Sequence, residues 1–193
     1  TAASLTARGM SHWFAAHDPV AWWARLDPER VALVDDARDR RHTYAALDEA
    51  AARWHALLAQ AGVAAGDRVA VLAGNRVEQF ALLLACWRAG AMLVPLNWRL
   101  AAPELGPVLA SARPRLLLGE GRFRALAEAA CAAGDVTTRW LDLDDDAHLL
   151  PGAADAPAPR HVDDGAGYLV LYTSGSTGAP KGVVLPRRQL VAN

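Results

Sequence analysis

Residues 67–96 read DRVAVLAGNRVEQFALLLACWRAGAMLVPL and contain one complete strand–helix–strand pattern. An apolar run at 67–73 is followed by a helix-like segment at 77–88, which Gly90 ends, and then by a second apolar run at 91–96. Strands that are apolar without alternation, such as VAVLA at 69–73, are typical of parallel sheets buried on both faces. This unit therefore predicts an α/β fold.

The same alternation extends through most of the chain. We expect a strand at 31–35 and a helix from 43 to 61, with Thr43 as its N-cap and Gly62 after its end. Further along we expect helices at 103–112 and 122–133 and strands at 115–119 and 139–143. Because short strands alternating with helices indicate βαβ units, the predicted fold class is α/β, a mostly parallel sheet with flanking helices.

The pattern divides the chain into four expected regions. These are a helical arm at 1–30, a βαβ-type subdomain at 31–143, a loop or linker at 144–167, and a strand–loop–strand segment at 168–193 that ends in the start of another helix. The linker is rich in proline, glycine and aspartate and has no periodicity. We interpret its acidic run, Asp144–Asp146, as a solvated loop and not as a metal site.

Composition excludes several classes of protein. The 193 residues carry 20 basic and 21 acidic side chains, a formal charge of −1, whereas a nucleic-acid-binding surface needs clustered positive charge. The longest uncharged apolar run, residues 80–87, is far shorter than the ~20 residues that cross a bilayer. No basic segment followed by an apolar one opens the chain, so we expect a cytoplasmic protein without nucleic-acid partner or transmembrane segment. Cys86 and Cys131 are interpreted as small buried hydrophobes, and the histidines lack metal-ligand spacing.

Lys181 is the only lysine, and the other 19 basic residues are arginine. A compact ammonium group at this one position suggests a role that a planar guanidinium cannot fill. Lys181 stands in a segment dense in glycine, serine and threonine, between apolar runs at 168–172 and 183–185 that are expected to be strands.

The loop between these strands has the chemistry of a phosphate site. Gly175 and Gly178 let backbone N–H groups approach an anion closely. Hydroxyl groups that can bind phosphate oxygens or a magnesium ion belong to Thr173, Ser174, Ser176 and Thr177. Together with Lys181, this pattern favours binding of the polyphosphate tail of a nucleotide.

Two common nucleotide-binding motifs do not fit the loop. A Walker A loop needs Gly-Lys-Ser/Thr leading into a helix, but Lys181 follows Pro180, precedes Gly182 and leads into an apolar run with strand character. The dinucleotide fingerprint needs a third glycine and a helix after it, and the segment beginning at Gly165 has neither. The sequence therefore excludes a P-loop NTPase and a Rossmann dehydrogenase.

The segment LYTSGSTGAPKGV at 171–183 closely resembles the phosphate-loop signature of the adenylate-forming (AMP-binding) superfamily, which includes acyl-CoA synthetases, peptide-synthetase adenylation domains and luciferases. Further segments resemble blocks of that family in the same order: TYAAL at 43–47, GDRVA at 66–70 and WRAGAMLVPLNWRL at 87–100. The resemblance covers residues 28–193. The asparagine at position 97 makes this segment similar to the acyl-CoA synthetase branch, since peptide-synthetase domains usually carry Asp at this position.

One segment departs from that branch. Residues 186–189 read PRRQ, where ligases of the branch commonly have Thr-His-Arg-Asn. The missing histidine suggests an altered acid pocket. Arg187 either contacts an anionic acid there or is a solvated arginine at the start of a helix.

The resemblance implies an AMP-forming acid–thiol ligase of fatty or aryl acid metabolism. A carboxylate would attack the α-phosphorus of ATP and release pyrophosphate, and the acyl-adenylate would pass its acyl group to coenzyme A or, as an alternative, to a carrier protein. The resemblance implies that Lys181 is catalytic and binds phosphate, that Thr173 binds Mg²⁺ and nucleotide, and that the β,γ-phosphates bind Ser174, Gly175, Ser176, Thr177 and Gly178.

The family's adenine-binding segment, magnesium-binding Glu, ribose-binding Asp, hinge and C-terminal catalytic lysine have no counterpart in this sequence. We therefore expect the N-terminal portion of a longer ligase, with the remainder C-terminal to Asn193, and we expect this segment alone to be inactive. Two alternatives are a non-catalytic nucleotide-binding module and a fragment completed in trans by a second polypeptide.

Overall fold

The computed structural model describes residues 18–144, 150–161, 163–173 and 180–192. Six strands form one sheet in the order β6-β5-β3-β4-β7-β8, in which β8 is antiparallel to β7 and all other neighbours are parallel. The strands are β3 (Arg68–Leu72), β4 (Met92–Pro95), β5 (Leu116–Gly119), β6 (Arg139–Asp142), β7 (Gly167–Thr173) and β8 (Lys181–Pro186). The predicted α/β class with a mostly parallel sheet is confirmed.

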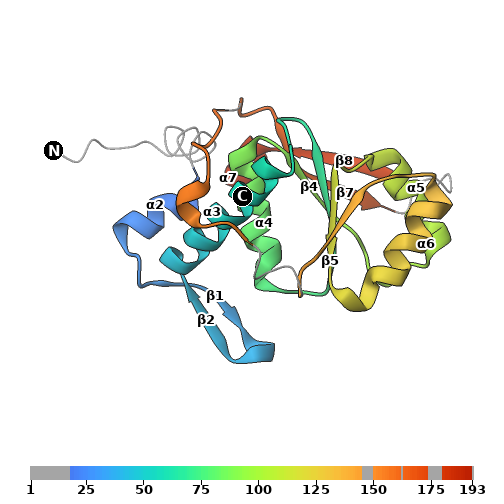
Figure 1. Ribbon diagram of the computed structural model, residues 1–193. Helices are drawn as coiled ribbons and strands as arrows, with labels where there is room; N and C mark the ends of the chain where they lie inside the picture. The colour runs from blue at the N-terminus through green and yellow to red at the C-terminus, as the bar shows by residue number, and fades with distance from the viewer. Residues whose placement is uncertain (1–17, 145–149, 162, 174–179, 193) are drawn as a thin grey trace.

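Helices cover both faces of this sheet (Figure 1). One face carries α3 (Tyr44–Gln60) and α4 (Val77–Ala89), and the other carries α5 (Ala102–Ala112) and α6 (Arg124–Gly134). The remaining helices are α2 (Pro19–Leu26), which packs on α3, and α7 (Arg187–Ala192), with short 3₁₀ turns at Asp36–Arg38, Gly121–Phe123 and Ala153–Asp155. No helix within the described ranges is long and apolar enough to cross a membrane.

A separate hairpin protrudes from this body (Figure 1). It consists of β1 (Val31–Asp35) and β2 (Arg40–Thr43), paired antiparallel. The strand at 31–35 is predicted by its apolar sequence. β2 is not predicted, because its sequence RRHT has no apolar alternation.

Capping signals in the sequence explain where the helices begin and end. The Oγ1 of Thr43 accepts a hydrogen bond from the N–H of Ala46 at 3.2 Å, which starts α3 as predicted. Gly90 ends α4 with φ of 73°, in the left-handed region that glycine adopts without strain. The α6 helix begins at Arg124 and not at residue 122, because the preceding residues form a 3₁₀ turn.

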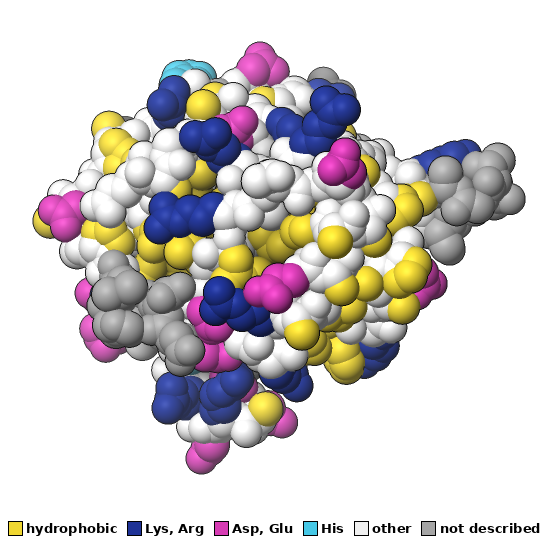
Figure 2. Space-filling view, turned by 45° about the vertical axis from the view of Figure 1, so that its right-hand side comes forward, with side chains coloured by type: hydrophobic (Ala, Val, Ile, Leu, Met, Phe, Trp, Pro, Cys, Tyr) yellow, Lys and Arg dark blue, Asp and Glu magenta, His cyan; other side chains and the backbone are white. Residues whose placement is uncertain are grey.

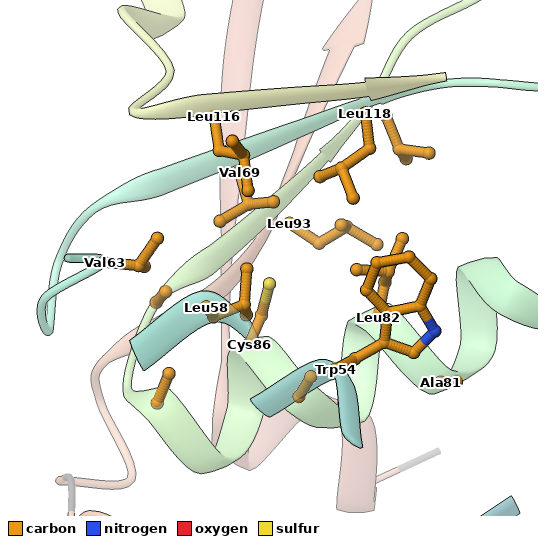
Figure 3. Packing of buried hydrophobic residues seen from close by; sticks show 14 of the residues in the cluster. Trp54, Leu58, Val63, Val69, Ala81, Leu82, Cys86, Leu93, Leu116 and Leu118 are labelled. Carbon is orange, nitrogen blue, oxygen red and sulfur yellow. The ribbon is translucent and has the colours of Figure 1, made fainter. Parts of the chain in front are cut away.

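Two hydrophobic clusters fill the space between the sheet and its helices, because successive residues of a strand point to opposite faces. Figure 3 shows the cluster on the α3 and α4 face, where Val69 and Leu93 lie above Trp54 and Leu82. The other face buries residues such as Ala70, Leu72, Leu105, Leu109 and Leu117. A strand buried on both sides needs apolar residues at every position, which explains the unbroken VAVLA run. Cys86 is buried in the first cluster as predicted, whereas Cys131 is only half-buried.

Arg88 connects four segments of the chain. Its buried guanidinium donates to the Oδ2 of Asp18 at 2.6 Å, and to the Oδ1 and the backbone oxygen of Asp48 at 2.5 and 3.1 Å. Its own backbone oxygen accepts the N–H of Arg160 at 2.8 Å. The last turn of α4 is therefore tied to the start of α2, to α3 and to the segment 150–161.

The segment 150–161 lies against α3 and has no strand or α-helix. The Arg53 side chain on α3 donates to the carbonyl oxygens of Leu150 and Pro151 at 3.2 and 3.1 Å. The flanking strands β6 and β7 belong to the same sheet, so the connection between them does not link two sheets.

We expect the Arg88→Leu substitution to lower the free energy of unfolding by about 3 kcal/mol, because the Asp18 carboxylate would stay buried without a cation. Urea denaturation measures this change. The Arg124→Leu variant is the matched control: its ion pair with Glu128 is exposed, so its effect is expected to stay below about 0.5 kcal/mol. Equal losses in the two variants would contradict the prediction.

His55 on α3 is buried, and its pKa is lowered by burial and then by the positive charges of Arg88 and Arg160. The unfolded chain therefore binds a proton more readily than the folded chain. The stability that the neutral imidazole provides is present above the ordinary pKa of about 6.5 and is lost as the pH falls below it.

We expect His55→Gln to weaken the fall in the free energy of unfolding between about pH 7 and pH 5, measured by urea denaturation. The exposed His161→Gln control should keep the wild-type slope, and a wild-type slope in His55→Gln would refute the assignment.

Candidate functional site

The two residues that flank the predicted phosphate loop lie at the carboxyl edge of the sheet. β7 ends at Thr173 and β8 begins at Lys181, and these two residues are partners in the antiparallel register. Because β7 runs parallel to β4, the loop leaves the sheet at the same edge as the residues that follow β3, β4 and β5. This edge is where open parallel sheets bind their ligands.

The structure brings together the two ends of the predicted site. Thr173 and Lys181 are both exposed. The Lys181 side chain forms no ion pair with any residue in the described ranges, so its charge is available to a ligand. The other predicted ligands lie outside the described residues: Ser174, Gly175, Ser176, Thr177 and Gly178.

Tyr172 fixes the hairpin close to this loop. Its hydroxyl donates a hydrogen bond to the Oγ of Ser111 on α5 at 2.9 Å. Its ring lies over the residue that follows Lys181, where a Cβ on Gly182 would come within 3.0 Å of the ring carbon Cζ. The glycine after the lysine therefore leaves room for the tyrosine that anchors the hairpin to α5.

A cavity of about 650 Å³ opens beside the loop. Its wall is mostly apolar and consists of Pro95, Leu96, Asn97, Leu100, Pro103, Glu104, Leu105, Pro107, Val108, Tyr172, Thr173 and Pro180. Apart from the Tyr172 hydroxyl, the carboxylate of Glu104 is the one ionisable group among these wall residues. This carboxylate accepts a hydrogen bond from the N–H of Ala101 at 2.8 Å. The described wall is thus an apolar surface that reaches the start and the end of the phosphate loop.

The loops after β4 and β5 form a group that we call the Arg99–Arg122 stack, made of Trp98, Arg99, Arg122 and Phe123. The rings of Trp98 and Phe123 are stacked with centroids 5.7 Å apart. The guanidinium of Arg99 lies 4.4 Å from the Trp98 centroid, and that of Arg122 lies 4.5 Å from the Phe123 centroid. Arg122 pairs with Glu120 at 2.6 Å, whereas exposed Arg99 pairs with no acid in the part of the chain that the structure describes.

The residues of this stack are not among the predicted site residues. The pair Trp98-Arg99 directly after an apolar run is a signal that could have indicated it, since it places an aromatic face and a cation at a strand end. Asn97 has a visible local role, because its side chain accepts the N–H of Arg99 at 3.1 Å and shapes the turn. Figure 2 shows that one face of the molecule mixes arginine, carboxylate and hydrophobic side chains and does not present a single sign of charge.

The acidic run is only partly the solvated loop of our prediction. The Asp144 carboxylate accepts from Arg76 at 2.8 Å and from the N–H of Gly121 at 3.2 Å, and the Arg76 hydrogen bond holds the pKa of Asp144 below its usual value. This carboxylate joins the loops after β3, β5 and β6. Within the described residues, no group of acids, histidines and cysteines could hold a metal ion; residues 145 and 146 lie outside them.

Both interpretations of Arg187 are wrong. Its side chain is 2% exposed, so it is neither solvated nor accessible to a substrate. The guanidinium instead lies over the ring of Trp87.

Comparison with known proteins agrees with this arrangement. The family model described as "AMP-binding enzyme" matches residues 20–193. Among curated relatives, the long-chain-fatty-acid–CoA ligase FadD13 of Mycobacterium tuberculosis is 37% identical over 83% of this chain and 33% of its own length. The fatty acid–[acyl-carrier-protein] ligase ScoC of Streptomyces coeruleorubidus is 36% identical over 88% of this chain and 32% of its own. A solved Mycobacterium tuberculosis fatty acyl CoA synthetase is 35% identical, with a TM-score of 0.77 over 87% of this chain and 34% of that chain. This chain spans about a third of the length of these relatives.

Proposed function

Because the chain belongs to the family of AMP-binding enzymes, we propose that it forms the phosphate-binding part of an ATP-dependent acid–thiol ligase. In this reaction a carboxylate attacks the α-phosphorus of ATP, pyrophosphate leaves, and the acyl-adenylate passes its acyl group to a thiol. The observation that carries the proposal is the strand pairing of Thr173 with Lys181 at the carboxyl edge, beside an apolar cavity. Within the described residues, the Lys181 side chain forms no ion pair.

We assign the loop to the β,γ-phosphates of ATP. Negative charge grows on these phosphates as pyrophosphate leaves, and fixed N–H, hydroxyl and ammonium groups stabilise such charge. We assign the phosphates to Ser174, Gly175, Ser176, Thr177 and Gly178, with Lys181 following the leaving group. The position of Lys181 next to the end of the loop supports its part in this assignment.

Magnesium fits the start of the loop. The exposed Thr173 hydroxyl is a hard oxygen donor of the kind that Mg²⁺ accepts. Phosphate oxygens, water and the magnesium-binding Glu that the resemblance places C-terminal to Asn193 would supply the other ligands. The ion would neutralise charge on the leaving pyrophosphate.

We propose coenzyme A as the acceptor thiol, bound at the Arg99–Arg122 stack. Coenzyme A carries phosphates and an adenine ring, and an exposed arginine beside an aromatic face can bind both groups. The stack stands at the same edge as the phosphate loop. A carrier protein is the second candidate acceptor, which the name of the ScoC relative favours.

The apolar wall of the cavity beside the loop supports a fatty or aryl acid as the substrate. We propose a cytoplasmic location for the enzyme. Adenine and ribose contacts would come from parts that the relatives have outside the matched third. We therefore propose that residues C-terminal to Asn193 complete the enzyme and that this segment alone does not form acyl-adenylate.

We expect Lys181→Ala to lower the rate of ATP–pyrophosphate exchange about 10²-fold, because the ammonium group stabilises the leaving phosphates. The measurement uses the natural protein that contains this chain and a panel of fatty and aryl acids. Lys181→Arg should recover only part of the rate, since a guanidinium has a different shape. Arg41→Ala removes an exposed charge on β2 and serves as the control. A near-wild-type rate in Lys181→Ala would exclude the assigned role.

We expect Arg99→Ala to raise the KM for coenzyme A about tenfold, the change that follows from losing one charge-assisted contact. Pyrophosphate exchange measured without coenzyme A should be unchanged, because it precedes thiol attack. Arg113→Ala is the matched control, since Arg113 caps the end of α5 at the opposite edge of the sheet. An unchanged KM, or equal losses in both reactions, would contradict the acceptor site.

A further inference from the structure

The hairpin of β7 and β8, which carries the proposed phosphate loop, is joined to the sheet by a short ladder. β7 pairs with β4 at one register position, Leu93 with Leu169. By contrast, β3 pairs with β4 and with β5 at four positions each, and β7 pairs with β8 at six. Side-chain contacts from helices on both faces of the sheet add to this strand pairing in orienting the hairpin.

Arg187, the first residue of α7, supplies such a contact. Its guanidinium carbon lies 4.4 Å from the ring centroid of Trp87 on α4, and its Nη2 donates to the backbone oxygen of the same residue. The Trp87 ring also packs edge to face against Tyr168 of β7, with centroids 5.4 Å apart. One side chain of α4 therefore contacts both the start of β7 and the residue that follows β8.

The buried cation is stabilised by partners that are present only in this arrangement. Burial lowers the pKa of Arg187 to about 10, and the negative charges of Asp164 and Asp18 act in the opposite direction. The group thus stays cationic at neutral pH, over a π face and against a carbonyl of the last turn of α4, where helix carbonyls are partly negative. A shift of the hairpin would leave this charge buried and unpaired, which is costly.

The opposite face of the hairpin has its own anchor, the hydrogen bond from Tyr172 to Ser111 on α5. Tyr172 adjoins Thr173 at the loop end, whereas Arg187 follows Pro186, which pairs with Gly167 at the open end. The hairpin is therefore held at both ends, and on both faces of the sheet.

We propose that Arg187, Trp87 and Tyr168 form a clamp that positions the phosphate loop. Arg187 is a positioning residue and not a catalytic one, because it stands at the opposite end of the hairpin from Lys181 and acts through the strand pairing. This inference rests on the proposed binding of ATP at the loop.

The test compares Arg187→Met with Arg188→Met in the natural protein that contains this chain. Arg188 is the adjacent exposed residue, so both variants lose one charge at the same helix start. Hydrogen–deuterium exchange reports on the amides of 167–173 and 181–186, and equilibrium binding gives the Kd for ATP. We expect Arg187→Met to speed exchange in these strands and to raise the Kd about tenfold, in line with one lost cation–π contact. Arg188→Met should change neither, and exchange in α5 and α6 should stay at the wild-type rate in both.

Further variants separate positioning from simple loss of stability. Arg187→Lys keeps the charge but loses the flat contact, so its Kd should lie between those of the wild type and Arg187→Met. Trp87→Leu combined with Arg187→Met should raise the Kd by less than the product of the two single effects, because both remove the contact between the guanidinium and the ring. An unchanged Kd in Arg187→Met, or exchange that speeds equally in all elements, would overturn the clamp. A wild-type protein that binds ATP but exchanges no pyrophosphate would overturn the ligase function alone, and one that binds no ATP would overturn both.

Discussion

The parallel pairing of β4 with β7 is the constraint on which the site depends, because this one ladder joins the hairpin to the other parallel strands. It sets the direction of β7, so that Thr173 ends at the same edge of the sheet as Pro95. Both residues line the cavity beside the loop. Since the ladder is short, side chains from α4 and α5 complete the attachment on the two faces. The two ends of the proposed phosphate loop are therefore positioned by contacts between segments that are far apart in the sequence.

The chain uses its two kinds of cation for different purposes. Arginines hold several acceptors at once: Arg68 donates to the carbonyls of Gly66, Ala112 and Arg113, and Arg88 joins carboxylates and a carbonyl from α2 and α3. A planar guanidinium suits such sites because its donors point in fixed directions. Lys181 instead stands exposed at the tip of a hairpin, without an ion pair in the described part of the chain. The only ammonium side chain is thus left available for a ligand, while guanidinium groups hold the fold together.

Local signals explain which parts of the fold could be predicted. Unbroken apolar runs and caps such as Thr43 and Gly90 act within a few residues, so the strands and helices of the sheet were expected close to their observed bounds. β2 lacks such a signal. The Arg99–Arg122 stack forms only where loops from two strands meet, and Arg187 is buried by a residue 100 positions earlier in the chain. The types of residue in the phosphate loop were readable from sequence, but the surroundings of the loop depend on topology.

The last turn of α4 contributes both to the stability of the fold and to the position of the candidate site. Trp87 and Arg88 are adjacent, yet they serve different parts of the molecule. Arg88 fastens α2, α3 and the segment 150–161 to the helix, whereas Trp87 contacts Tyr168 and Arg187 and so holds the hairpin of the phosphate loop. A buried arginine is costly unless each of its partners is in place. The departure from the family pattern at Arg187 is therefore matched inside the same chain by an aromatic face and a helix end. Any displacement of α4 would change both the packing of α2 and α3 and the orientation of the β7–β8 hairpin.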